Sequence, residues 1–233
     1  MPKRGADANP AFVLLHIGKT GGTALRDMLD NAPSGCGADR IKMLRHKGGL
    51  GAAATRFPEA KLGFIVRDPV DRAVSGFLGR LRQGQPRYNT PWDADETEVF
   101  TRFPTPEALG LALAANLPEA RAALQKVLHL RMDYAHFVGS VETLQTHAPR
   151  IFFVGDLASY DLDIARLKRL TDLPQDLHPP TDAIAAHRNP DQTLATLTPA
   201  ARAGWEKTLS LDRQIYAACM AIRQRQVAAE GRG

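Results

Sequence analysis

Residues 12–29 read FVLLHIGKTGGTALRDML, and this stretch decides the fold. Its first six residues form an apolar run rich in residues that favour strands, and the run stops at Gly18. A glycine-rich turn follows, and from Ala24 onward apolar residues recur at helical spacing. The stretch therefore predicts a buried strand, a tight turn and a helix in succession.

The turn between this strand and this helix has the composition of an anion-binding loop. Its glycines allow backbone N–H groups to converge on an anion, the helix N-terminus adds roughly half a positive charge, and Lys19 adds a full one. The loop is not a Walker A motif, G-x-x-x-x-G-K-[ST], because Val13 stands where the first glycine belongs. We therefore expect an anion other than a triphosphate held in the usual way.

A second charged motif, RDPVDRAVS from Arg67 to Ser75, follows another apolar strand. Its Asp-Pro pair suits a helix N-cap and first helical position, so a helix is expected directly after the strand. Ligands of open parallel sheets bind at the carboxyl ends of strands, and Arg67 is therefore expected on the same rim as Lys19. Ser75 lies off the apolar stripe of the helix. Arg67 and Ser75 are thus available for a second anion.

Apolar strands that alternate with helical patterns predict an α/β fold, with three layers and a P-loop-like central parallel sheet flanked by helices. The expected strands are residues 12–17, 62–66 and 151–154. Further helices are expected at residues 106–129, 140–147, 156–170 and 198–225. The last of these is amphipathic through Leu211, Ile215, Ala218 and Ile222. The chain suits one domain, residues 1–233, in which the proline-rich residues 83–105 form a lid or an insertion loop.

Composition limits the class of protein. Hydrophobic residues make up 44% of the chain, and no apolar run approaches the ~20 residues of a membrane span. Cys36 and Cys219 are too few for a disulfide framework and lack metal-ligand spacing. No signal-peptide pattern is present, so a cytoplasmic protein is expected. The net charge of +5, with 22 arginines against 8 lysines, suits oxyanion recognition, although high-GC coding explains the arginines about as well.

The two motifs resemble those of the sulfotransferases that use 3′-phosphoadenosine 5′-phosphosulfate (PAPS). HIGKTGGTAL, followed some forty residues later by FIVRDPVDRAVSGF, is closest to the heparan sulfate 6-O- and 2-O-sulfotransferase branch and its bacterial relatives. The segments FFVGDLASYDLDIARLKRL, HRNP and LSLDRQIYAAC also resemble the family's third strand, its late nucleotide-side loop and its terminal helix. The resemblance covers most of the chain, and its specific part lies in residues 12–82.

This resemblance assigns roles to the motif residues. It implies a loop for the 5′-phosphosulfate made of Lys19, Thr20, Gly21, Gly22 and Thr23. It also implies that Arg67 and Ser75 hold the 3′-phosphate. A donor with a phosphate group at each end of an adenosine accounts for both expected anion sites. Arg188, within HRNP, is a further candidate for the donor, in a segment that either closes over the nucleotide or forms a turn before the last helices.

Sulfuryl transfer to a hydroxyl resembles phosphoryl transfer, an in-line displacement in which the protein positions the reactants and neutralises charge on the leaving oxygens. Lys19 is the residue expected to neutralise that charge. His46 is the expected base, because related sulfotransferases carry their catalytic histidine between the two anion motifs. Without the resemblance, a histidine between Arg45 and Lys47 would be interpreted as a surface residue. No metal is expected, because Lys19, backbone amides and arginines supply the positive charge.

The expected activity is therefore transfer of a sulfuryl group from PAPS to a hydroxyl of a carbohydrate or small molecule. The short chain without a membrane anchor favours a small metabolite, a lipid-linked sugar or a glycan precursor over a lumenal polymer. Two other classes stay open: a P-loop kinase or NTPase, in which Asp156 would hold magnesium, and a non-catalytic anion-binding module. Nucleic acid is not an expected partner, because the basic residues are scattered and not interleaved with aromatic residues.

Overall fold

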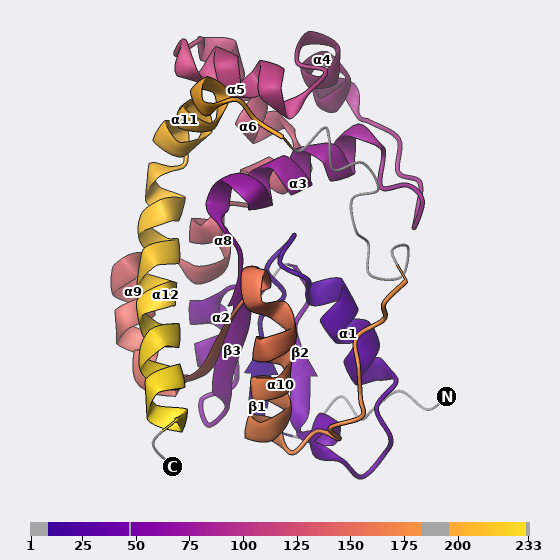
Figure 1. Cartoon of the computed structure of the whole chain (residues 1–233), viewed down its shortest axis with the longest axis vertical. Coiled ribbons are helices and arrows are strands. Elements are labelled where there is room, and N and C mark those ends of the chain that lie inside the picture. The colour runs from indigo at the N-terminus through magenta and orange to yellow at the C-terminus, as the bar shows by residue number, and fades with distance from the viewer. Residues whose placement is uncertain (1–8, 47, 183–195, 232–233) are drawn as a thin grey trace.

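The computed structural model describes residues 9–46, 48–182 and 196–231, and at its centre lies a sheet of four parallel strands (Figure 1). The strands are β1 (Phe12–Leu14), β2 (Ile41–Met43), β3 (Lys61–Val66) and β4 (Ile151–Asp156). Their order across the sheet is β2-β1-β3-β4. The chain thus goes from β1 to one side and then returns to the other, which places a topological switch point between β1 and β3.

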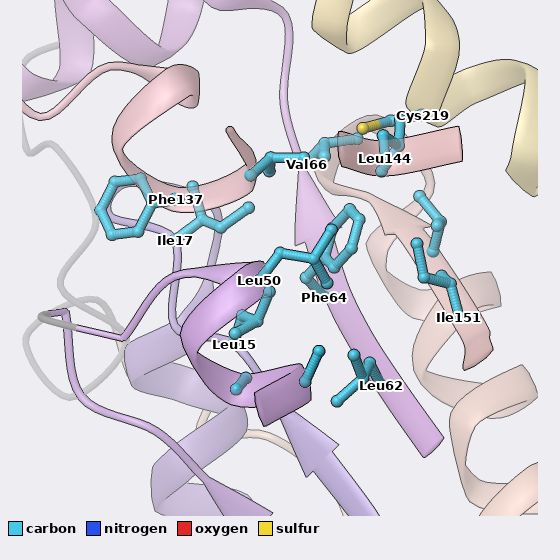
Figure 2. Packing of buried hydrophobic residues seen from close by; sticks show 14 of the residues in the cluster. Leu15, Ile17, Leu50, Leu62, Phe64, Val66, Phe137, Leu144, Ile151 and Cys219 are labelled. Atoms are coloured by element: carbon cyan, nitrogen blue, oxygen red, sulfur yellow. The ribbon is translucent and has the colours of Figure 1, made fainter. Parts of the chain in front are cut away.

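Helices cover both faces of this sheet, as the apolar character of the strands predicts. One face packs against α1 (Gly22–Asp30) and α10 (Tyr160–Thr171). The other packs against α2 (Leu50–Arg56), α8 (Tyr134–Val138), α9 (Val141–His147) and α12 (Ser210–Glu230). Figure 2 shows this second core, in which Phe64 of β3 lies with Leu50 of α2, Leu144 of α9 and Cys219 of α12. The predicted α/β class with a parallel sheet flanked by helices is confirmed.

A third hydrophobic cluster lies beyond the carboxyl ends of the strands (Figure 1). It is built by α3 (Pro69–Leu81), α4 (Ala94–Arg102), α5 (Pro106–Ala114), α6 (Pro118–Lys126), α7 (Leu128–Arg131) and α11 (Pro199–Thr208). Helix α3 connects the two parts, because it begins directly after β3 and buries Val70, Val74 and Phe77 in this cluster. The predicted helix start holds: the Asp68 carboxylate accepts hydrogen bonds from the N–H groups of Val70 and Asp71, both at 3.0 Å.

Residues 83–105 contain a helix where the sequence predicts a loop. Helix α4 begins after Asp93, whose carboxylate accepts a hydrogen bond from the Glu96 N–H at 2.8 Å, and it buries Val99 and Phe100. Within the same stretch the Trp92 indole N–H donates to the Arg80 carbonyl at 2.7 Å. The prolines that suggested a loop lie on either side of this helix, so the prediction is wrong for residues 94–102.

The long helix expected at residues 106–129 is three helices. Asn116 adopts a left-handed backbone with φ 57°, and Pro118 then starts α6, so the chain turns between α5 and α6. The helical pattern at 198–225 is likewise divided, into α11 and α12. Of its four predicted apolar positions, Leu211 is half exposed, whereas Ile215 and Ile222 pack on the sheet. No helix in the ranges that the structure describes has the length and apolar character to cross a membrane.

Gly204 of α11 provides a test of the packing between α5 and α11. A Cβ at this position would lie 2.1 Å from the Gly110 carbonyl oxygen and 2.5 Å from the Ala114 nitrogen, both backbone atoms that cannot rotate away. We expect Gly204→Ala to lower the free energy of unfolding by about 1–3 kcal/mol, the usual cost of overpacking. The control is Gly51→Ala in α2, where nothing lies within 4 Å, and it should raise stability by up to about 1 kcal/mol. Urea titration of both variants measures this, and equal effects would contradict the proposed close approach.

Candidate anion-binding site

A cavity of about 820 Å³ opens at the switch point between β1 and β3. Its volume lies in the range of small-molecule sites, and its position is where open parallel sheets bind their ligands. Both predicted motifs line it, through Lys19, Gly21, Gly22, Thr23, Arg67 and Ser75, and His46 lines it as well. The structure thus brings together most of the candidates that the sequence separates widely. Arg188 lies outside the described residues.

The glycine-rich loop leaves the start of α1 without a side-chain partner. Gly21 is the N-cap residue, with φ 82°, and it provides no side-chain hydrogen bond, while the first turn of the helix has no acidic residue. A Cβ on Gly21 would lie 2.8 Å from the Tyr160 ring, and one on Gly22 would lie 2.3 Å from the His16 ring. Both glycines are therefore required by close approach. The free N–H groups and the dipole of α1 favour an anion at this point.

Two residues of the loop differ in what they present to the cavity. The buried Thr20 hydroxyl donates to the Ile17 carbonyl at 2.9 Å, so this side chain holds the loop together and does not line the cavity. Thr23, by contrast, lines the cavity from the first turn of α1. The loop therefore offers an anion the Thr23 side chain, and Thr20 contributes to the shape of the loop.

Lys19 lies in an excess of positive charge. Its Nζ packs against α3, where a Cβ on Gly79 would lie only 2.4 Å away. Burial, followed by the charges of Arg82, Arg67, Arg80 and Arg72, lowers the pKa of Lys19 to about 7. Within the ranges described, Lys19 forms no ion pair, and neither does Arg67. A buried cation without a carboxylate partner costs free energy, and this arrangement is typical of a site that binds an anion.

Other arginines of this group already have partners and support the structure. Arg80 pairs with the buried Glu96, with Nε and Oε1 2.7 Å apart. Arg72 donates from Nε to the Gly18 carbonyl at 3.1 Å and lies 3.8 Å from the Asp212 carboxylate. Arg72 therefore ties the glycine-rich loop to α3, a role that its place in the second motif did not predict.

Arg67 is fixed at its main chain and reaches the cavity with its side chain. Its N–H donates to the Tyr134 hydroxyl oxygen at 2.8 Å, and that hydroxyl donates to the Arg67 carbonyl at 2.7 Å. The guanidinium lies near the first motif, with Nη1 3.4 Å from the Lys19 carbonyl oxygen. Ser75 lines the same cavity from the second turn of α3. The cations of the two motifs thus lie side by side at neighbouring strand ends.

His46 has the hydrogen bond that a histidine base requires. Its Nδ1 lies 3.3 Å from the His16 carbonyl oxygen, and because that oxygen only accepts, Nδ1 carries the proton and Nε2 keeps its lone pair. The two imidazole rings pack at 3.9 Å between centroids. Burial lowers the pKa of His46. Burial, together with the charges of His46 and Arg26, lowers the pKa of His16 to about 3. Both rings are therefore neutral at pH 7.

His16 has a supporting role. Its Nδ1 accepts a hydrogen bond at 2.9 Å from Arg26, which also donates to the Leu44 carbonyl at 3.1 Å. This network links α1 to the segment that carries His46. His16 is buried and lines the cavity from the residues that follow β1.

His129 is a cavity residue that the sequence did not single out. It belongs to the short helix α7, lines the cavity, and its Nδ1 is enclosed without a hydrogen-bond partner among the described residues. Burial and the nearby charges of Lys19 and His46 lower its pKa to about 2, so it is neutral. Its position depends on Gly76, where a Cβ would lie 3.0 Å from the His129 Cβ. Only tertiary packing places it here.

Comparisons with known proteins leave the site to be interpreted from its own geometry. No family model, no curated protein and no solved structure matches the chain. In the part of the chain that is described, no three or more His, Cys, Asp or Glu side chains gather as metal ligands would. What the geometry offers is a cavity with two neighbouring cations, a helix N-terminus and three neutral histidines, His16, His46 and His129.

Sulfate binding should weaken as the pH rises from 6 to 9. Lys19, with its pKa of about 7, loses its proton in this interval, and an anion binds the charged form more strongly. His16 and His129 titrate far below it. Between pH 7 and the pKa of ~10.4 of a free lysine, Lys19 has largely lost its proton in the folded protein and keeps it in the unfolded chain. Without a bound anion, the free energy of unfolding therefore rises with pH across this interval.

Calorimetric titration with sulfate at several pH values measures the effect, since sulfate itself does not titrate in this range. Lys19→Met removes the charge and should abolish the pH dependence together with most of the affinity. A wild-type affinity that stays constant from pH 6 to 9 would overturn the assignment of Lys19 to the anion.

Proposed function

We propose that this protein is a PAPS-dependent sulfotransferase with a P-loop-like fold. The observation that carries the proposal is the pair Lys19 and Arg67, two cations without carboxylate partners in the described structure, at the carboxyl ends of β1 and β3. PAPS has a phosphosulfate at the 5′ position and a phosphate at the 3′ position, so it supplies one anion to each cation. The resemblance of the two motifs to the sulfotransferase family supports the same donor.

Donor binding divides between the two motifs. Lys19 and the start of α1, from Gly21 to Thr23, take the 5′-phosphosulfate, because backbone N–H groups and the helix dipole favour charge there. Arg67 and Ser75 take the 3′-phosphate. The Arg67 guanidinium is suited to a phosphate through two parallel N–H donors. The expected contribution of Arg188 stays a prediction from the sequence.

The transfer is an in-line displacement at sulfur. The acceptor oxygen forms a bond to sulfur while the bond from sulfur to the bridging oxygen of the 5′-phosphate breaks, and adenosine 3′,5′-bisphosphate leaves. Lys19 stabilises the charge that develops on the leaving oxygens. The acceptor hydroxyl gives its proton to Nε2 of His46, whose Nδ1–H is held by the His16 carbonyl. The acceptor is a carbohydrate or small-molecule hydroxyl, and the site of action is the cytoplasm.

The kinase or NTPase alternative receives less support. In that interpretation Asp156 would hold magnesium beside the phosphates. Asp156 ends β4, which pairs with β3 and not with β1, and its buried side chain is not part of the cavity lining. Val13 also remains in the place of the first Walker glycine. The observed arrangement favours a donor with two separate anionic groups.

The donor is tested by calorimetric titration with adenosine 3′,5′-bisphosphate and, separately, with magnesium-ATP. We expect the bisphosphate to bind much more tightly, and Arg67→Ala to weaken it by about tenfold to a hundredfold, as expected for a lost charge-assisted contact. Arg169→Ala on α10, an exposed arginine outside the cavity lining, is the matched control and should leave the affinity unchanged. Preference for magnesium-ATP would favour the kinase class instead.

The role of His46 is tested by separating turnover from binding. His46→Ala should lower turnover by about 10²- to 10⁴-fold, the usual contribution of a general base, while the affinity for the bisphosphate stays within a few-fold of wild type. His136→Ala, an exposed histidine of α8, is the control. Sulfate release from PAPS with a panel of hydroxyl acceptors provides the assay. Full activity in His46→Ala would exclude His46 as the base, and intact binding with no turnover in any wild-type assay would favour a binding module.

A further inference from the structure

A carboxylate lines the cavity that the two cations open to an anion. Asp71, in the first turn of α3, is part of the lining, and the neighbouring Asp68 lies one residue after Arg67. Burial lowers the pKa of Arg67, and the negative charges of Asp71 and Asp68 oppose that change, so both act on the guanidinium. Left alone, these carboxylates would attract Arg67 and repel a phosphate. Their presence in an anion site therefore requires an explanation.

Arg202 of α11 forms ion pairs with both carboxylates. Its Nη1 lies 3.2 Å from the Asp71 Oδ1, and its Nη2 lies 3.3 Å from the Asp68 Oδ1. Its Nε lies 3.2 Å from Glu206, one helical turn further along α11. All three nitrogens of the guanidinium are thus directed at carboxylates. Arg202 itself does not line the cavity.

The two carboxylates are held to different degrees. Asp68 caps α3 through hydrogen bonds from two N–H groups, so its side chain is fixed even without Arg202. Asp71 is half exposed, and its ion pair in the described structure is the one with Arg202. Asp71 is therefore the side chain that Arg202 controls. Without Arg202 its charge would be uncompensated at the edge of the cavity.

We propose that Arg202 is a positioning residue that holds Asp71 away from Arg67 and cancels its charge, and thereby keeps Arg67 available to an anion. The inference rests on the proposed function to the extent that the anion is the 3′-phosphate of the donor. In this proposal, the anion affinity of the site at the end of β3 depends on the ion pair between Asp71 and Arg202, two residues 131 positions apart in the chain.

The experiment is a double-mutant series titrated with adenosine 3′,5′-bisphosphate and with sulfate. Arg202→Ala should raise the dissociation constant of the bisphosphate by about tenfold, the size of one close charge interaction in partly exposed surroundings. Asp71→Asn in the Arg202→Ala background should restore most of the affinity, because it removes the competing charge. Asp71→Asn alone should bind at least as tightly as wild type. All losses should shrink at high salt.

Controls separate this role from a purely structural one. Arg213→Ala removes another arginine that approaches Glu206, at 3.7 Å, without touching Asp71, and should leave affinity unchanged. Arg202→Lys keeps the charge and loses the fork, so it should fall between wild type and Arg202→Ala. Circular dichroism and thermal unfolding establish that each variant is folded. If Arg202→Lys does not fold, the test rests on the comparison of Arg202→Ala with the double variant that carries Arg202→Ala and Asp71→Asn.

The outcomes distinguish the two proposals. A loss in Arg202→Ala that Asp71→Asn does not restore, or no loss at all, overturns the role of Arg202 while leaving the donor assignment intact. If the wild-type protein binds sulfate and does not prefer the bisphosphate, the donor assignment is overturned. A loss of sulfate affinity in Arg202→Ala that Asp71→Asn restores would still support the positioning role of Arg202. Binding of neither anion by the wild-type chain overturns both.

Discussion

Uncompensated positive charge at neighbouring strand ends is the constraint on which the rest of this structure depends. Lys19 and Arg67 lie at the carboxyl ends of β1 and β3 without carboxylate partners in the described ranges. Such an arrangement opposes folding, because burial penalises the charged form of each group. The protein limits this cost by pairing the nearby Arg80 with Glu96 and Arg72 with Asp212. The charge left over is directed into one cavity, where an anion can be bound strongly.

Close approach of backbone and side chains gives the loop its shape. Gly21 and Gly22 leave room for the Tyr160 and His16 rings, and Gly79 leaves room for the Lys19 ammonium. Each of these glycines costs conformational entropy on folding. These glycines allow the loop to pack closely against α3, against Tyr160 of α10 and against the His16 ring, so the cations and the histidines meet at one cavity. In our proposal, the ion pairs of Arg202 act on the charge balance of this same site.

The sequence predicts those features that a local pattern determines. Strands β1, β3 and β4 are apolar runs, so they are recognisable, whereas β2 is only three residues long, includes Lys42 and gives no such run. Helix α4 was missed because prolines on either side outweighed the N-cap signal of Asp93. Strand order is set by tertiary pairing, and it is this order that places Lys19 beside Arg67.

The site shows the same division between local and long-range information. Lys19, in the loop after β1, and Arg67, directly after β3, both line the cavity, so their predicted place on one rim is confirmed. His129 and Arg202 reach the site only through helix packing, and no spacing rule connects them with the motifs. Thr20 shows the converse case. It stands in the middle of the motif, but its hydroxyl donates a hydrogen bond within the loop and does not line the cavity. Position in a motif predicts proximity to a ligand and does not predict the direction of a side chain.

The positive charge around the histidines also affects the order of steps in the proposed chemistry. Burial and the charges of Arg26, Lys19 and Arg72 lower the pKa of His46, while its hydrogen bond to the His16 carbonyl opposes this change. A neutral His46 has the lone pair that a base requires, but a low pKa makes it a weak proton acceptor. A bound polyanionic donor offsets the charge of Lys19 and therefore raises the pKa of His46. In the proposed mechanism His46 therefore becomes a stronger base once the donor is bound, which favours removal of the acceptor proton only in the complex that holds the donor.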